Sequence, residues 1–529
     1  MTAPWRSLTG VALVLLLVVC AAGAAPAPGG TVTIGLDQEP PTLDPHATPS
    51  AVTYQITANL AESLLYENQD GRILPWLATG FQVSADGKSF TFSLRNDVTF
   101  SDGAPLDGAA VKWNFDRIVD PHFAAGASLT NLTGYAGTTV VDDHTVRVNF
   151  KAPFAPFLTY AAGSWLPLLS PKTTPEQGPA VNTQPIGSGP FVISEWVRQD
   201  HIAMERNPRY ARRAPWSSHQ GPPYLDRVVW KIVPEAGARA ATINSGETQM
   251  ITLLGAPASV LPSLQADKAL RVESLPYPGS SDMLFLNARV APTDDLQVRR
   301  AISYAVNRPA YAETIVKGLG TPACGPLSRH TLDDPSLCAT HLYDPQKAAQ
   351  LLDEDGWRMG PNGIRQKNGT SLTIVINTIN YGGGIAPEIE LLQGQLLSVG
   401  IDARVKGQAR PPYYEDNYRC ATNATTIFLR STDWDGLYAL FSSSAIGGNF
   451  NWACYSNAEV DRLLAQGREE LVPARRRATY VTLERLLLDQ AVAVPLYDVL
   501  SVWAIRNTVR DTKYTYATYP VLNDVYIQK

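Results

Sequence analysis

The 529-residue sequence has few charged residues, few histidines and few cysteines, and their distribution argues against several classes of protein. Charged residues make up 18% of the chain and the formal net charge is −5, so we expect no nucleic-acid partner. The seven histidines form no H-E-x-x-H motif and the five cysteines form no C-x-x-C pair, so we expect no metal site. After the N-terminus, no run approaches 18 uninterrupted apolar residues, which argues against a membrane-spanning helix.

Common catalytic and nucleotide-binding motifs are also missing. The sequence contains no G-x-S-x-G nucleophile elbow and no G-x-x-x-x-G-K-[ST] phosphate loop. We therefore expect a protein that is not an enzyme and holds no cofactor. A catalytic triad assembled from distant residues stays open as an alternative, because triad members need not be close in sequence.

The N-terminus has the composition of an export signal. Residues 1–25 combine one arginine, an apolar run from Val11 to Val19 and small residues, and the run is too short for a membrane span. Cleavage after Ala22–Ala24 would release the protein outside the cytoplasm. Alternatively, the segment that ends at Cys20 is similar to a lipobox, although Val19 replaces the usual small residue, and Cys20 would then carry a lipid anchor.

Four cysteines remain after the export signal, at positions 324, 338, 420 and 454. In an exported chain this number favours two disulfides, and three pairings are possible. Because Cys324 and Cys338 flank a short proline-containing segment, we expect the sequential pairing Cys324–Cys338 and Cys420–Cys454. Four free thiols are the alternative.

Strand and helix patterns occur throughout the chain and predict an α/β protein. Residues 31–36 and 144–150 alternate apolar and polar side chains, as half-buried strands do. Asp344 and Gly356 bracket one predicted helix, Gly400 ends another, and Ser456 with Glu459 forms a predicted capping box. Pro/Gly-rich connections at 171–190 and 276–293 are candidate crossings between lobes.

The segment 75–118, PWLATGFQVSADGKSFTFSLRNDVTFSDGAPLDGAAVKWNFDRI, combines a strand, a turn and an amphipathic helix without chemically reactive motifs. It closely resembles the signature region of the family 5 extracellular solute-binding proteins of ABC importers. Further blocks along the mature chain have the same resemblance. These blocks are EPPTLDPHA (39–47), IGSGPFVISEW (186–196), FLNARVAPTDDLQVRRAISYAVNRPAYAETIVKGLG (285–320), YDPQKAAQLLDEDGW (343–357), YSNAEVDRLL (455–464) and VAVPLYDVLSVWAIR (492–506).

The resemblance implies a two-lobe periplasmic-binding-protein-like fold of type II, cluster C, with an extra subdomain in the first lobe. The implied ranges are 31–50, 185–283 and 497–529 for lobe I, 51–184 for the subdomain, and 284–496 for lobe II. It further implies a monomer that carries a solute, which we expect to be a peptide, to the permease subunits of an ABC importer. Nickel chelates, haem, opines and sugars are alternative solutes, and an exported enzyme or sensor on this fold is a third alternative.

The resemblance also implies ligand-binding residues in a cleft between the lobes. Asp433 lies where peptide-binding members carry the carboxylate that meets the ligand's ammonium, and Asp435 is the neighbouring alternative. Trp434 could form the wall of a side-chain pocket. Further expected cleft residues are Glu39, Asn449, Asn451 and Trp452. Surface-turn roles for both aspartates and a core role for Trp434 are the alternatives.

Overall fold

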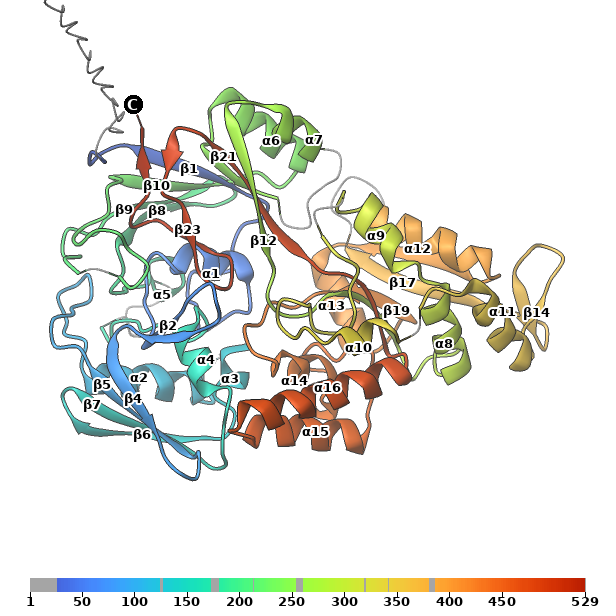
Figure 1. Cartoon of the computed structure of the whole chain (residues 1–529). Helices are drawn as coiled ribbons and strands as arrows, with labels where there is room; N and C mark the ends of the chain where they lie inside the picture. Colours follow the sequence, from blue (N-terminus) through green and yellow to red (C-terminus); the bar gives the residue numbers. More distant parts are fainter. Residues whose placement is uncertain are drawn as a thin grey trace, which may run out of the picture.

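The computed structural model describes residues 26–528 except 124–126, 173–179, 213, 254–259, 318–319, 341 and 380–385. The predicted export signal and Cys20 therefore lie outside the described residues. Within the described part of the chain, no helix is long and apolar enough to cross a membrane. Three sheets mark three parts of the molecule (Figure 1). The seven-stranded sheet lies at upper left, the four-stranded sheet at lower left and the five-stranded sheet at right.

A seven-stranded sheet forms the core of the first lobe, in the order β12-β21-β11-β1-β10-β9-β8. Strand β1 pairs in parallel with β10 and β11, and its alternate side chains Val32 and Ile34 are fully buried. The helices α6 (Ala236–Ser245) and α7 (Leu261–Ala266) contribute to a second core beside it. The strands are β1 (Thr31–Leu36), β8 (Phe191–Val197), β9 (His201–Arg206), β10 (Arg227–Ile232), β11 (Met250–Thr252), β12 (Leu270–Pro276) and β21 (Leu500–Arg506).

A five-stranded sheet forms the core of the second lobe, in the order β18-β17-β19-β13-β20. Its strands are β13 (Asp282–Leu286), β17 (Thr373–Ile379), β18 (Asp402–Gln408), β19 (Ala424–Ile427) and β20 (Ala493–Tyr497). The helices of this lobe are α8 (Leu296–Ala305), α9 (Arg308–Thr314), α10 (Pro335–Cys338), α11 (Pro345–Glu354), α12 (Pro387–Ser398), α13 (Arg410–Tyr418), α14 (Gly436–Phe441), α15 (Ala458–Glu469) and α16 (Pro473–Asp489). Apolar residues of α8, α11 and α12 join the strands in one buried cluster.

The chain passes between these two sheets at two places. One passage runs from β12 to β13 through residues 277–281, and the other runs from β20 to β21 through residues 498–499. Gly279 has φ +121°, and a Cβ there would lie 2.1 Å from the carbonyl oxygen of Leu429. Two short connections of this kind can act as a hinge. The residue ranges predicted for the lobes and the subdomain stay a prediction.

A four-stranded antiparallel sheet, in the order β4-β5-β7-β6, forms the subdomain that contains the signature segment. Phe90, Phe92 and Leu94 of β5 are buried, as the alternating pattern predicts. Helix α2 (Gly108–Val119) begins at Asp107, whose carboxylate accepts a hydrogen bond from the Ala110 amide at 2.8 Å. The strands are β4 (Ala78–Val83), β5 (Ser89–Leu94), β6 (Tyr135–Asp142) and β7 (Thr145–Phe150).

Helices α15 and α16 of the second lobe reach back to the subdomain at the lower edge of the molecule (Figure 1). The amide of Ala155, just before α4 (Phe157–Ala162), donates to the carbonyl oxygen of Arg468 at 2.8 Å. The two parts therefore touch at a place remote in sequence from the crossings.

Two sequence predictions about connections and caps are wrong. The described ends of the connection at 171–190 lie in the same half of the molecule, because Leu169 forms a bridge with Gly187 and the chain then enters β8 of the seven-stranded sheet. The cap of α15 is Asn457 rather than Ser456, since the Asn457 side chain accepts from the amides of Glu459 and Val460. The Asp344 cap is confirmed, with the Lys347 amide donating to its carboxylate at 2.9 Å.

Both predicted disulfides are present. Cys324 bonds to Cys338 and Cys420 bonds to Cys454, which confirms the sequential pairing.

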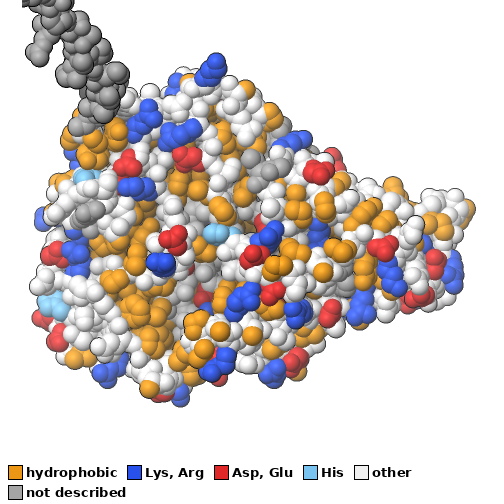
Figure 2. Space-filling view, in the orientation of Figure 1, with side chains coloured by type: hydrophobic (Ala, Val, Ile, Leu, Met, Phe, Trp, Pro, Cys, Tyr) orange, Lys and Arg blue, Asp and Glu red, His pale blue; other side chains and the backbone are white. Residues whose placement is uncertain are grey.

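On the face shown in Figure 2, acidic and basic side chains are mixed with apolar ones, without a large area of one sign. The remaining elements are α1 (Ala51–Thr57), α3 (Ala127–Thr130), α5 (Ala180–Thr183), η2 (Ser443–Ala445), β2 (Leu65–Glu67), β3 (Ile73–Pro75), β14 (Arg358–Met359), β15 (Arg365–Lys367), β16 (Thr370–Ser371), β22 (Val509–Arg510), β23 (Lys513–Tyr514), β24 (Pro520–Val521) and β25 (Tyr526–Ile527).

Candidate functional site

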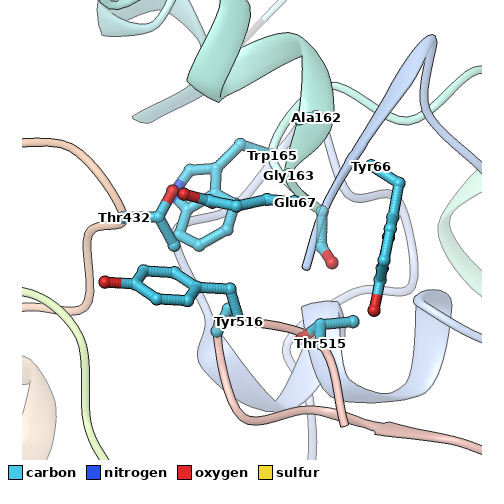
Figure 3. A pocket seen from close by; sticks show the side chains of 10 residues that line it. Tyr66, Glu67, Ala162, Gly163, Trp165, Thr432, Thr515 and Tyr516 are labelled. Carbon is cyan, nitrogen blue, oxygen red and sulfur yellow. The ribbon is translucent and has the colours of Figure 1, made fainter. Parts of the chain in front are cut away.

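A small cavity lies where three segments distant in sequence meet. Residues 66–67 of β2, residues 162–165 after α4 and residues 515–517 after β23 form its walls, and Thr432 of the second lobe completes it (Figure 3). Its volume is about 20 Å³, which accommodates one or two groups of the size of a water molecule. A whole solute therefore requires the lobes to separate.

Aromatic rings form much of the cavity wall and are themselves supported by other rings. Trp165 stacks on Tyr54 with ring centroids 5.7 Å apart, and Tyr66 packs against Trp216 at 4.5 Å. Tyr516, from the first lobe, stacks at 5.0 Å on His330 of the second lobe. These contacts fix the wall residues in position, and they place Tyr516 at the contact between the lobes.

Glu67 is the acidic residue of the cavity wall, and its carboxyl end points toward Thr432 (Figure 3). Its exposed fraction is 6%, since β2 is buried at every position. Burial raises the pKa of Glu67 to about 8, a hydrogen bond from Thr432 acts in the opposite direction, and the charge of Asp433 adds to the increase. The sequence offers one signal for this residue, an acid directly after the apolar run Leu64–Tyr66.

Arg430 lies two residues before Thr432, beside the crossings. Its guanidinium sits between the rings of Tyr277 and Tyr519, 4.2 Å and 4.4 Å from their centroids. One terminal nitrogen donates to Ser501 at 3.2 Å and to Thr518 at 3.3 Å, while Nε is buried without a hydrogen-bond partner among the described residues. No carboxylate of the described residues forms an ion pair with Arg430.

Both predicted aspartates are buried and each is already paired with an arginine. Arg476 holds Asp433 through two nitrogens, one of them 2.8 Å from Oδ2. Arg468 holds Asp435 through contacts of 2.7 Å and 2.9 Å. Surface-turn roles for these aspartates are therefore excluded, and a ligand ammonium would meet carboxylates whose charge is already compensated. Their role in ligand binding stays a prediction.

Trp434 and Glu39 lie outside the wall of this cavity. The indole nitrogen of Trp434 donates to the Thr331 carbonyl at 2.8 Å, and its ring packs edge-on against Tyr480. Glu39 accepts from the indole nitrogen of Trp196 at 2.9 Å in the first lobe. Both assignments stay predictions.

The predicted wall at 449–452 is organised around internal contacts. Asn451 is buried, and its side-chain nitrogen donates to the carbonyl oxygens of Ser442 and Tyr455 at 2.9 Å. Trp452 packs in an aromatic cluster with Tyr413 and Phe450. Asn449 accepts from the neighbouring amide at 3.1 Å. None of the three lines the cavity, and their ligand role is likewise still a prediction.

Comparison with known proteins places the chain among exported binding proteins. The model of bacterial extracellular solute-binding proteins, family 5 (middle part), matches residues 72–448. The glutathione-binding protein GsiB of Salmonella paratyphi A is 28% identical over 481 residues, 86% of each chain. Two solved structures share the two-lobe α/β fold. NikA from Brucella suis in complex with Fe(III)-EDTA has a TM-score of 0.82, 24% identity and coverage of 94% of this chain and 100% of its own. The oligopeptide-binding protein AppA from Bacillus subtilis in complex with a nonapeptide has a TM-score of 0.81, 21% identity and coverage of 95% and 100%.

Proposed function

Because this chain belongs to family 5 of the bacterial extracellular solute-binding proteins, we propose that it binds a short peptide with free termini between its lobes. It then delivers the peptide unchanged to the permease of an ABC importer. The relatives that bind glutathione and a nonapeptide support a peptide ligand. Nickel chelates, haem, opines and sugars are the alternative solutes.

The observation that carries the proposal is the charge of Arg430, which forms no ion pair with a carboxylate of the described residues. Burying a guanidinium without a carboxylate is costly, and the aromatic rings and hydroxyls around Arg430 compensate it only in part. A peptide whose chain passes Thr432 can place its terminal carboxylate at Arg430, since two residues span at most about 7 Å. An Arg–carboxylate pair also gives bidentate geometry and thus orientation.

Calorimetric titration with glutathione and tri-alanine tests the proposal, with Ni(II)–histidine and haem as competing candidates. We expect binding of at least one peptide, and mass spectrometry of the recovered peptide should find it intact. Binding of nickel or haem alone would overturn the peptide assignment, and cleavage that depends on the folded protein would overturn the binding role.

The Arg430 contribution is tested with peptide amides. Arg430→Gln should weaken binding of a peptide with a free carboxylate by about 30-fold or more, because one partner of a desolvated charge pair is lost. The same variant should bind tri-alaninamide about as well as the original protein does. Arg404→Gln, which changes an exposed arginine of the same lobe, is the matched control. Equal affinities of Arg430→Gln and the original protein for tri-alanine would contradict the assignment.

A further inference from the structure

Glu67 is a buried acid that forms no ion pair with a cation of the described residues. Its Oε2 has no hydrogen-bond partner among the described residues, and no lysine, arginine or histidine is present in the cavity wall. A buried acid with an unpaired oxygen is costly unless it is neutralised by a proton or by a positive group. The cavity in front of this carboxylate is therefore the place where a positive group would be stabilised most.

The groups around Glu67 do not supply that positive charge. Tyr66 and Tyr516 are neutral phenols whose pKa values are raised, to about 12 in each case, by burial first and by Glu67 second. Asp433 is an acid whose charge acts on Glu67, and it is compensated by Arg476. His330 lies behind the Tyr516 ring, and burial lowers its pKa, which favours the neutral form.

Resting on the proposed function, we propose that Glu67 receives a primary ammonium group of the ligand in this cavity. This ammonium is the cationic end of the bound peptide. The cavity volume of about 20 Å³ fits an ammonium, which is close to a water molecule in size, but not a guanidinium or a quaternary ammonium. The rings of Trp165 and Tyr516 add aromatic surface that attracts a cation. The hydroxyl of Thr432 brings the second lobe to the same carboxylate.

The assignment distinguishes Glu67 from Asp433. The two oxygens of Asp433 are held by Arg476, so an added ammonium gains little there. Among the described residues, by contrast, Oε2 of Glu67 has no hydrogen-bond partner and the cavity wall holds no competing cation. Closure without an ammonium leaves Glu67 buried, and the carboxyl group must then take up a proton.

Two pairs of peptides, each with a free and an acetylated amino group, isolate the contribution of the ammonium charge to binding. They are tri-alanine with N-acetyl-tri-alanine, and glutathione with N-acetyl-glutathione, titrated into the original protein, Glu67→Gln and Glu205→Gln. Glu205 is an exposed glutamate of the first lobe and controls for the loss of one charge. Glu67→Gln should bind the free peptides about 30-fold or more weakly, and should bind the N-acetyl forms at least as well at pH 7.

The pH dependence gives a second, independent readout. Burial in the closed form raises the pKa of Glu67 from its ordinary value of 4.5 to about 8, and opening of the cleft should remove that burial. The proton that Glu67 takes up on closure therefore favours the binding of N-acetyl peptides when the pH lies below its ordinary pKa. This contribution is lost as the pH rises toward the raised pKa of the closed form. Between pH 5.5 and 7.0 the affinity for N-acetyl peptides should fall by up to about tenfold per pH unit. The affinity for free peptides should stay flat, and Glu67→Gln should remove the difference, while any His330 titration affects both peptides alike.

The outcomes separate this inference from the proposed function. Unchanged affinity of Glu67→Gln for the free peptides, or the same pH dependence for free and acetylated peptides, overturns the ammonium assignment and leaves peptide binding intact. Retained binding of the N-acetyl peptides shows that the variant is folded. If no peptide binds, the proposed function fails, and 1,4-diaminobutane decides the assignment. If 1,4-diaminobutane raises the melting temperature and Glu67→Gln abolishes the rise, the ammonium assignment is supported. If 1,4-diaminobutane causes no rise, the assignment is overturned.

Discussion

At the scale of single residues, arginine partners decide what the acidic side chains of the second lobe can do. Asp433 and Asp435 are only two positions apart, and each is buried against its own arginine, Arg476 or Arg468. Burial of an ion pair contributes little net stability, but removal of one partner leaves an uncompensated charge inside the protein. These aspartates therefore have a structural role whether or not a ligand also contacts them.

Asp433→Asn should lower the free energy of unfolding by about 3–5 kcal/mol, because Arg476 loses its compensating charge in a buried position. Urea denaturation at neutral pH measures the change. Asp97→Asn is the matched control, since it breaks a solvent-exposed pair with Arg95 and should cost at most about 1 kcal/mol. Unchanged stability of Asp433→Asn together with a large loss of peptide affinity would instead support the ammonium role predicted from the sequence.

At the scale of elements, two disulfides constrain connections in the second lobe. Cys420 follows α13 and bonds to Cys454, which lies before α15, so the bond joins segments that flank the aromatic cluster around Trp452. Both cysteines have positive φ, 55° and 49°, a region that non-glycine residues seldom occupy. The crosslink therefore stabilises two tight turns as well as a long loop.

Removal of Cys420–Cys454 should destabilise the protein more than removal of Cys324–Cys338. Loop-closure entropy for separations of 34 and 14 residues corresponds to about 4 and about 3 kcal/mol, respectively. Paired Cys→Ala variants, compared by denaturant unfolding under identical conditions, measure the difference. The reverse order of stabilities would show that native-state contacts, and not loop length, determine the contribution of each bond.

At the scale of the whole molecule, the contact between the subdomain and the second lobe bridges the two halves away from the crossings. The hydroxyl of Tyr160 donates to Asp435 Oδ2 at 3.0 Å, and the Ala155 amide donates to the Arg468 carbonyl. Asp435 keeps its Arg468 partner when the halves separate, because both lie in the second lobe. We therefore expect the hydrogen bond from Tyr160 to Asp435 in the closed form alone.

Tyr160→Phe should weaken the binding of every ligand by the same factor, about 10- to 150-fold. A hydrogen bond to a charged group contributes about 1.5–3 kcal/mol, and here it favours closure without touching the ligand. Titrations with glutathione and tri-alanine measure the factor, and small-angle scattering should show a larger radius of gyration for the variant at subsaturating peptide. Tyr343→Phe, at an exposed site, is the control. A loss that differs between ligands would place Tyr160 in the binding site instead.

The sequence by itself determined the α/β class, the signature strand–turn–helix and the Asp344 cap, because local patterns encode these features. It favoured the sequential disulfide pairing but left the other pairings and free thiols open, and the structure decided between them. It also identified the family through ordered blocks along the chain. It could not show that Asp433 and Asp435 meet Arg476 and Arg468, which lie more than 30 positions away. It also missed Glu67 and Arg430, whose lack of an oppositely charged partner among the described residues becomes visible only when β2, the 428–432 segment and the 515–519 segment come together. Burial and pairing depend on which distant groups surround a side chain, and only the tertiary structure decides that.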